Sequence, residues 1–152
     1  RAAPGPKRPS SSPTVPSAAA VCSLDMVAPM KTPWFQSKAS ATGRVLLAGL
    51  SSAELTGWLQ AYPLRRLTAH TVTDVPTLLL HIESARQKDY SLAVQEHELG
   101  VQALAVPLRN AGGHVVGALN VVAAPHRWST DEFIAALLPV LQDAAQELRA
   151  LV

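Results

Sequence analysis

The pattern of hydrophobic and polar positions divides the chain near residue 38. Residues 1–37 hold seven of the twelve prolines together with serine clusters such as RPSSSPTVPS, and they show no helical or strand period. A segment of this composition buries too little apolar surface to offset the conformational entropy lost on folding. We therefore expect irregular or disordered chain over residues 1–37 and a folded domain over residues 38–152. The alternative for the stretch VAPMKTPWFQ is an extended arm docked on that domain.

Apolar residues spaced as on one face of a helix predict two helices at the start of the domain. The first helix opens at the small residues 41–43 of ATGRVLLAGL. The second follows a capping box, in which the Ser51 and Glu54 side chains each accept a hydrogen bond from the other residue's backbone amide. Pro63 ends it, because proline cannot donate the next helical hydrogen bond.

A third helix is expected after a polar loop over residues 63–73. Asp74 has the side chain of an N-cap, and Pro76 fits the first turn, where a backbone amide has no intrahelical partner in any case. The helix should run to about residue 89. Three of its apolar residues are expected on one face: Leu79, Ile82 and Ala85.

Beyond residue 89 the hydrophobic period becomes that of strands. The segments YSLAVQ, VQALAVPLR and HVVGALNVVA predict three strands, and NAGG at 110–113 supplies the positive-φ positions of a hairpin turn between the last two. The last strand is apolar on both faces, so we expect it to be buried on both. Ser129 and Glu132 form a second capping box, which opens a helix to the end of the chain that Pro139 should kink or break in two.

This order of elements predicts an α+β fold, an antiparallel sheet with helices packed on it. Three strands make a thin sheet. We therefore expect the sheet to be incomplete on its N-terminal side, and to be completed by further strands or by a partner.

Composition narrows the class of protein. The formal net charge of +2 is small and the basic residues are scattered, so charge alone does not indicate nucleic-acid binding. Cys22 is the one cysteine, which excludes an internal disulfide, and no Cys/His cluster has the spacing of a metal site. No apolar run reaches the roughly 18–20 residues that cross a bilayer. We expect a cytoplasmic protein with no metal and no membrane association.

The run Glu96-His97-Glu98 is the one local pattern that suggests acid–base or metal chemistry. On an extended segment His97 faces away from the two carboxylates, so a solvated or hydrogen-bonding loop is the favoured interpretation. The serines and the cysteine lie in no nucleophile motif, and neither a P-loop nor a G-x-G-x-x-G fingerprint is present, so no cofactor is expected. The candidates considered for nucleophilic catalysis are Cys22, Ser91 and Ser129. An enzyme is not expected.

Two features favour a binding site. The small residues Ala41 and Thr42 open a helix, where backbone amides and the helix dipole attract an anion; the alternative is only a tight packing of the helix start against the sheet. Asn120 is a polar residue inside an apolar strand, and its amide either pairs with nearby backbone or points into a pocket.

From residue 38 onward the chain resembles the effector-binding domain of IclR-family bacterial transcriptional regulators. The resemblance is carried by ATGRVLLAGLS, by RLTAHTVTD and by residues 96–100 followed by QALAVPLRNAGGHVVGALNV. The loop and the ALNV segment are most similar to the family branch that senses aromatic acids of the protocatechuate and β-ketoadipate pathway. The resemblance implies a GAF/profilin-like domain, which forms dimers or pairs of dimers in this family. It also implies operator binding through a helix-turn-helix, which is not recognisable in this sequence.

The same resemblance implies a ligand site. The backbone amides that hold the ligand's carboxylate fall at Ala41 and Thr42, and the opposite wall falls at four further positions: Ala93, Ala103, Asn120 and Val122. Known members carry small polar or acidic groups at that wall, whereas here only Asn120 can form hydrogen bonds. We therefore expect an aromatic or longer acid instead of glyoxylate or pyruvate. The alternative is a dimerisation or scaffold module that has lost its ligand pocket.

Overall fold

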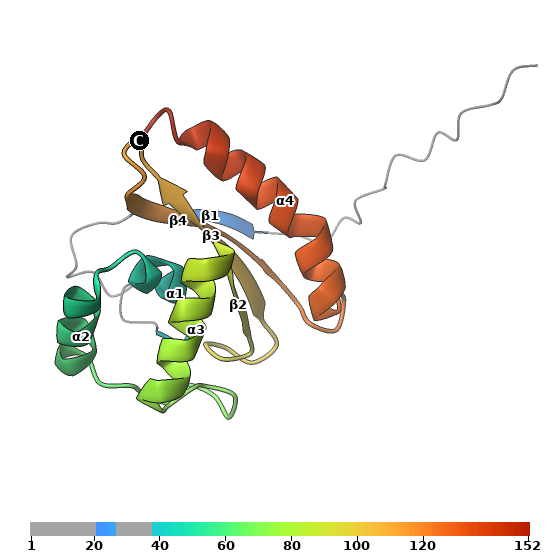
Figure 1. Cartoon of the computed structure of the whole chain (residues 1–152). Coiled ribbons are helices and arrows are strands. Elements are labelled where there is room, and N and C mark those ends of the chain that lie inside the picture. The colour runs from blue at the N-terminus through green and yellow to red at the C-terminus, as the bar shows by residue number, and fades with distance from the viewer. Residues whose placement is uncertain (1–20, 27–37) are drawn as a thin grey trace, which may run out of the picture.

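The computed structural model describes residues 21–26 and 38–152 (Figure 1). The residues before 21 and those from 27 to 37, which include the expected extended arm, lie outside the described part. The described elements, in chain order, are β1 (Val21–Met26), α1 (Ala41–Ala48), α2 (Ser52–Ala61), α3 (Val75–Lys88), β2 (Ser91–Val94), β3 (Gln102–Arg109), β4 (Val115–Ala123) and α4 (Thr130–Leu148). The expected α+β fold is confirmed.

The strands form one antiparallel sheet in the order β1-β4-β3-β2. At residues 21–26 the expected irregular chain is wrong, because they form β1 and pair along β4 with Cys22 opposite Val121. For the other residues of the range 1–37 the expectation stays a prediction. A short strand with prolines on both sides gives little local signal. Its hydrogen bonds go to a partner far along the sequence, which the hydrophobic period cannot report. The described sheet therefore has four strands, one more than the three predicted.

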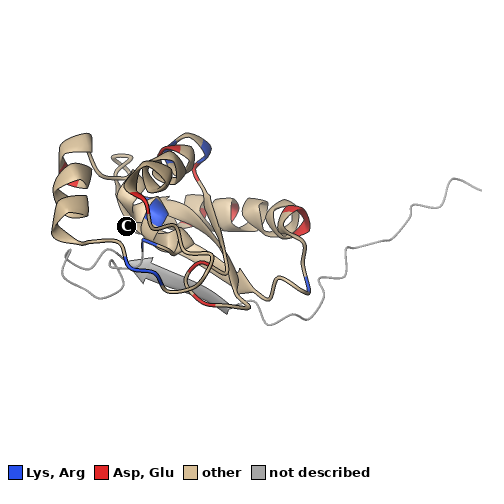
Figure 2. Ribbon diagram, turned by 90° about the horizontal axis from the view of Figure 1, so that it is seen from below, with Lys and Arg blue, Asp and Glu red and all other residues tan. Residues whose placement is uncertain are grey.

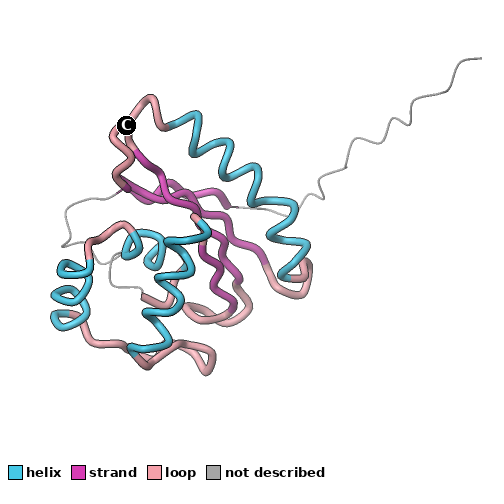
Figure 3. Tube along the Cα trace, in the orientation of Figure 1, coloured by secondary structure: helices cyan, strands magenta, loops and turns pink. Residues whose placement is uncertain are grey.

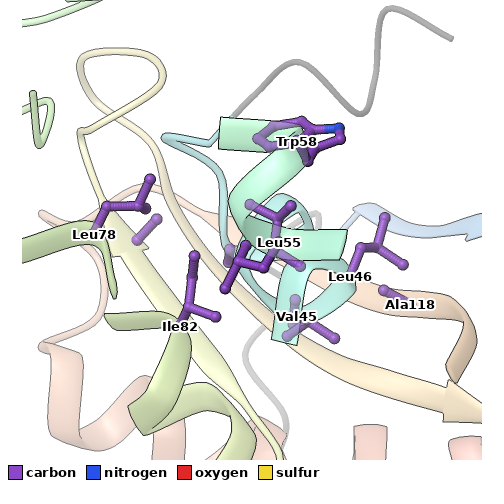
Figure 4. Packing of buried hydrophobic residues seen from close by; sticks show 11 residues of the cluster. Val45, Leu46, Leu55, Trp58, Leu78, Ile82 and Ala118 are labelled. Atoms are coloured by element: carbon purple, nitrogen blue, oxygen red, sulfur yellow. The ribbon is translucent and has the colours of Figure 1, made fainter. Parts of the chain in front are cut away.

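Helices cover both faces of this sheet, with α1 and α3 on one side and α4 on the other (Figure 1). Side chains alternate along each strand, so β3 and β4 contribute to two separate cores. Leu104 and Leu119 pack with Phe133 of α4, whereas Ala105 and Ala118 pack under α1. The expected burial of β4 on both faces is confirmed. Figure 4 shows the α1 side, which is filled from α1, α2 and α3.

The predicted helix starts agree with the structure. Both capping boxes form, and the Asp74 carboxylate accepts a hydrogen bond from the Thr77 amide across 2.9 Å. The buried face of α3 differs from the predicted one at a single position. Leu79, which was expected to be buried, is 39% exposed, and Leu78 is fully buried in its place. With Ile82 and Ala85, Leu78 follows the i, i+4, i+7 spacing of a packed helix face.

Pro139 lies inside α4 but does not break it, since one helix runs from Thr130 to Leu148. Of the two expected outcomes at Pro139, the division into two helices is therefore wrong, and the kink stays a prediction. Proline removes the hydrogen bond to the carbonyl four residues earlier, at Ala135. Both Pro139 and Ala135 are exposed, so the proline lies on the solvent side of the helix, where a missing hydrogen bond is tolerated best.

The C-terminal end of α1 is fixed by a side chain from α3. Arg86 donates from Nε to the Ala48 carbonyl across 3.1 Å and from Nη2 to the Leu50 carbonyl across 3.2 Å. These carbonyls lie where a helix has no amides left to pair with its own oxygens. Arg86 therefore holds α1 against α3, and the start of α1 keeps a defined place relative to the sheet.

Candidate functional site

The start of α1 has the features of a capped helix with open amides. Ser40 is the N-cap, and its hydroxyl accepts a hydrogen bond from the Gly43 amide across 2.9 Å. Ala41 and Thr42 occupy the first two helical positions, whose amides have no acceptor in a preceding turn. Ala41 is fully buried and Thr42 is half-buried, so these amides lie at the edge of the core. Their role in holding a carboxylate stays a prediction.

The four wall positions lie together on the sheet. Ala93, Ala103 and Val122 are direct neighbours across β2, β3 and β4, and Asn120 is two residues along β4 from Val122. All four side chains therefore belong to the face that α1 covers. Ala41 and Ala93 belong to one buried cluster, against which Ala103 packs. The fold thus brings together residues that are far apart in sequence, although their ligand-binding role stays a prediction.

Glu96 differs from its neighbours in the acidic run. Its carboxylate receives two hydrogen bonds from Arg44 of α1, one of them across 3.0 Å from Nη1 to Oε1. Arg44 has no exposed surface, whereas His97 and Glu98 are exposed. Glu96 is therefore engaged with Arg44, and the three residues form no group placed to hold a metal ion within the described part of the chain. Their hydrogen bonding was expected in general terms, but the buried partner of Glu96 was not predicted.

Two loops meet beside this ion pair. Thr68 and Thr71 of the α2–α3 loop donate from their hydroxyls to the Gln95 and Glu96 carbonyls, each across 2.6 Å. The second loop is closed on itself, because the Gln95 amide donates to the Val101 carbonyl across 2.7 Å. Figure 3 shows both loops at the same end of the sheet. They form a fixed surface next to the residues that lead into α1.

A cavity of about 470 Å³ lies at this junction. Its volume falls within the range of roughly 300–1,000 Å³ that is typical of small-molecule sites. The wall is formed by residues before α1, by the end of α2 and its following loop, and by the β2–β3 loop: Lys38, Ala39, Tyr62, Pro63, Leu64, Arg65, Leu67, Thr71, Val72 and His97. None of the expected site residues is in this wall, although Ala39 and Lys38 precede Ala41 directly.

Lys38 is the unusual member of this wall. Only 5% of its surface is exposed, and its ammonium has no hydrogen-bond partner among the residues that the structure describes. The ammonium lies 4.7 Å from the centre of the Trp58 ring, and burial lowers the pKa of Lys38 below its ordinary value of 10.5. Sequence reasoning missed it because a lone lysine in QSKAS gives no sign of burial.

The residues considered for catalysis do not form a site. Ser91 is buried at the start of β2, and the Ser129 hydroxyl is engaged with Glu132 in the capping box. Cys22 lies in β1. Within the part of the chain that the structure describes, no group of histidine, cysteine and acidic side chains is placed to hold a metal ion. Among the same residues, no helix is both long and apolar enough to span a membrane.

Charged residues are likewise dispersed. Figure 2 shows lysine and arginine positions interspersed with acidic ones over the described helices and loops. An electrostatic surface for a nucleic-acid backbone needs basic residues gathered along one face. The described residues do not show such an arrangement.

The chain matches a family model described as "Bacterial transcriptional regulator IclR C-terminal" over residues 35–150. It is 43% identical over 114 residues to the p-hydroxybenzoate hydroxylase transcriptional activator of Acinetobacter baylyi, covering 75% of this chain and 42% of that protein. It is 40% identical over 111 residues to the Pca operon regulatory protein of the same organism, covering 73% and 40%. The chain therefore spans about two fifths of the length of these relatives.

Solved structures are similar to this chain in fold as well. A double mutant of the PobR inducer-binding domain from Acinetobacter, in complex with 3-hydroxybenzoic acid, superposes with a TM-score of 0.73 at 43% identity; the match covers 76% of this chain and 66% of that chain. The Thermotoga maritima IclR protein superposes with a TM-score of 0.69 at 26% identity, covering 74% and 45%.

Proposed function

Because the chain belongs to the IclR family of bacterial transcriptional regulators and carries its C-terminal effector-binding domain, we propose that it senses an aromatic carboxylic acid. The carboxylate would be held at the Ala41 and Thr42 amides, and the opposite end of the acid would lie near Asn120. The observation that carries this proposal is the shared sheet face of Ala93, Ala103, Asn120 and Val122 beneath the start of α1.

The chemistry of these positions supports an aromatic acid over a very small polar one. Ala93, Ala103 and Val122 offer apolar surface, and only Asn120 adds a hydrogen-bonding amide. A ring contacts such a wall favourably, whereas a two- or three-carbon keto acid leaves its polar atoms without partners. The relatives agree with this choice, since one regulates a p-hydroxybenzoate enzyme and another structure holds 3-hydroxybenzoic acid.

For the whole protein we propose regulation of transcription by effector-dependent binding to operator DNA through a helix-turn-helix domain. The relatives are transcriptional regulators, which supports a role without catalysis. We further propose that the protein is cytoplasmic and acts as a homodimer or homotetramer. The alternative, a scaffold module without a pocket, is not favoured, because the chain is similar to an inducer-binding domain in complex with 3-hydroxybenzoic acid.

Thermal unfolding with a panel of acids tests this proposal. Benzoate, 3-hydroxybenzoate and p-hydroxybenzoate are compared with glyoxylate and pyruvate. An acid present at about a hundred times its dissociation constant raises the free energy of unfolding by roughly 2.7 kcal/mol. We expect this stabilisation from at least one aromatic acid and not from the keto acids. Absence of a shift with every aromatic acid contradicts the proposal.

The place of the polar end is tested by Asn120→Ala. Loss of one hydrogen bond to a ring hydroxyl, worth about 1 kcal/mol, should weaken binding of 3-hydroxybenzoate by about fivefold and leave benzoate binding unchanged. Gln142→Ala, at an exposed position of α4 on the other side of the sheet, is the matched control. An equal effect of Asn120→Ala on both acids contradicts a contact between Asn120 and the hydroxyl.

A further inference from the structure

Lys38 is held in an environment that leaves its charge uncompensated. Only 5% of its surface is exposed, and its ammonium, which has three hydrogen-bond donors, has no acceptor among the described residues. The Trp58 ring, 4.7 Å away, provides a cation–π contact but no acceptor oxygen. A buried cation without an acceptor is costly, so a partner of opposite charge would be bound strongly there.

No acidic residue of the cavity wall supplies that partner. The lining side chains that can carry a charge near neutral pH are Lys38, Arg65 and His97, all of them basic. Glu96, the residue before His97, is engaged with Arg44 through both carboxylate oxygens. The cavity therefore has a positive character, and the N-terminal end of the α1 dipole adds to it from the residues that follow Lys38.

Apart from Thr71, the remaining wall is apolar. Tyr62, Leu64, Leu67 and Val72 line the same space, and the Tyr62 ring lies against Trp58 with 5.1 Å between the ring centres. A cavity that combines an apolar wall with a basic end fits a molecule with an aromatic body and a single anionic group. It does not fit a polyanion, which would leave charges against apolar surface.

We infer that Lys38 is the counter-ion of the effector's carboxylate, and that the effector's ring occupies the cavity between the α2–α3 loop and the β2–β3 loop. This inference rests on the proposed sensing of an aromatic acid and revises where the acid binds. The ring would lie in this cavity instead of against Ala93, Ala103 and Val122, so Asn120→Ala would then leave binding of 3-hydroxybenzoate unchanged. The ammonium would donate to a carboxylate oxygen, while the start of α1 faces the same anion. Lys38 would thereby distinguish an acid from its neutral amide.

Isothermal titration calorimetry with 3-hydroxybenzoate and the neutral 3-hydroxybenzamide tests this assignment on the full 152-residue chain. Lys38→Met is expected to weaken 3-hydroxybenzoate binding at least about tenfold and to leave 3-hydroxybenzamide binding unchanged, since it removes a charge-assisted hydrogen bond. Lys38→Arg, which keeps the charge, should retain most of the preference for the acid. Lys88→Met, at an exposed lysine of α3, is the matched control and should bind as the wild type does.

The outcomes distinguish a failure of the Lys38 assignment from a failure of the proposed function. If the wild type binds 3-hydroxybenzoate and Lys38→Met binds it equally well, the assignment of Lys38 is overturned while the proposed function stands. If no aromatic acid binds the wild type, both are overturned.

A crystal structure of the wild type with 3-hydroxybenzoate provides a readout that does not depend on the folding of a variant. We expect a carboxylate oxygen at about 2.7–2.9 Å from the Lys38 ammonium. A carboxylate that contacts only the α1 amides overturns the role of Lys38 and leaves the proposed function in place.

Discussion

Arg44 of α1 and Glu96 of the β2–β3 loop form a two-bond ion pair inside the domain. Nη1 of Arg44 donates to Oε1 of Glu96 across 3.0 Å, and Nη2 donates to Oε2. Arg44 is fully buried, so the charge of its guanidinium is compensated by this carboxylate and not by water. The pair ties the helix that opens at Ala41 to the loop that carries His97 of the cavity wall.

Glu96→Ala should destabilise the domain strongly. Removing one partner of a buried ion pair leaves an uncompensated charge, which costs about 3–5 kcal/mol. The control is Glu98→Ala, at an exposed position of the same loop, which should change the free energy of unfolding by no more than about 0.5 kcal/mol. Urea unfolding measures both. Equal, small effects of the two substitutions would show that Arg44 does not depend on Glu96.

Substitution of alanine for each of two glycines should change the stability of the domain in opposite directions. A Cβ atom at Gly49 would lie 2.8 Å from Cβ of Val115, so Gly49→Ala should cost about 1–3 kcal/mol through overpacking. A Cβ at Gly57, inside α2, meets nothing within 4 Å. Gly57→Ala should therefore stabilise the domain by about 0.5–1 kcal/mol through a better helix propensity. Thermal unfolding of the two variants checks the signs; a stabilising Gly49→Ala would mean that β4 shifts freely away from α1.

Thr71 should be more important for stability than its surroundings in a polar loop suggest. Its hydroxyl accepts from the Leu67 and Thr68 amides across 3.1 and 2.8 Å and donates to the Glu96 carbonyl across 2.6 Å. Thr71→Val keeps the shape but leaves these groups unpaired, at a cost of about 1–3 kcal/mol. Thr73→Val is the control, because Thr73 is exposed and has only a 3.4 Å contact with Arg66. A loss no larger for Thr71 than for Thr73 in chemical unfolding would contradict this role.

The burial of Lys38 predicts a pH dependence with a definite sign. Burial lowers its pKa in the folded protein below 10.5, so between the lowered value and 10.5 the unfolded chain binds more protons. The contribution of Lys38 to the free energy of unfolding therefore increases with pH between the lowered pKa and 10.5. The free energy of unfolding of the wild type, minus that of Lys38→Met, should increase from about pH 7 to about pH 10.

Arg65 and His97, the other basic groups of the cavity, are present in both of those proteins. Lys88→Met provides the reference, since Lys88 is exposed and its difference should stay flat. A flat difference for Lys38→Met as well would show that its ammonium is solvated in the folded protein.

The elements of the domain could be predicted because their signals are local. Ser51 with Glu54, Asp74 and Ser129 each mark a helix start within one turn, and the structure has a cap at each of them. The strand β1 could not be predicted, because residues 21–26 are fixed by pairing with β4 and not by their own pattern. The helix also continues through Pro139, because whether a proline divides a helix depends on its surroundings, which the sequence pattern does not report.

The residues of the candidate site also divide into those that the sequence could identify and those that depend on contacts between distant segments. The resemblance to the family provided Ala41, Thr42 and the sheet positions, and the strand register places those sheet positions on one face. The burial of Lys38 and the pairing of Arg44 with Glu96 arise from contacts between segments that are distant in sequence. No period or motif in a single sequence reports such contacts, so these residues could be found only once the packing was known.

Calorimetric titration of the wild-type chain with 3-hydroxybenzoate and 3-hydroxybenzamide tests the central claim most directly, because the claim is that this domain recognises an aromatic acid by its charge. We predict saturable binding of the acid and binding of the amide that is weaker by at least about tenfold, as expected for the loss of a charge-assisted hydrogen bond. Equal affinity for the acid and the amide, or no binding of either, would contradict it.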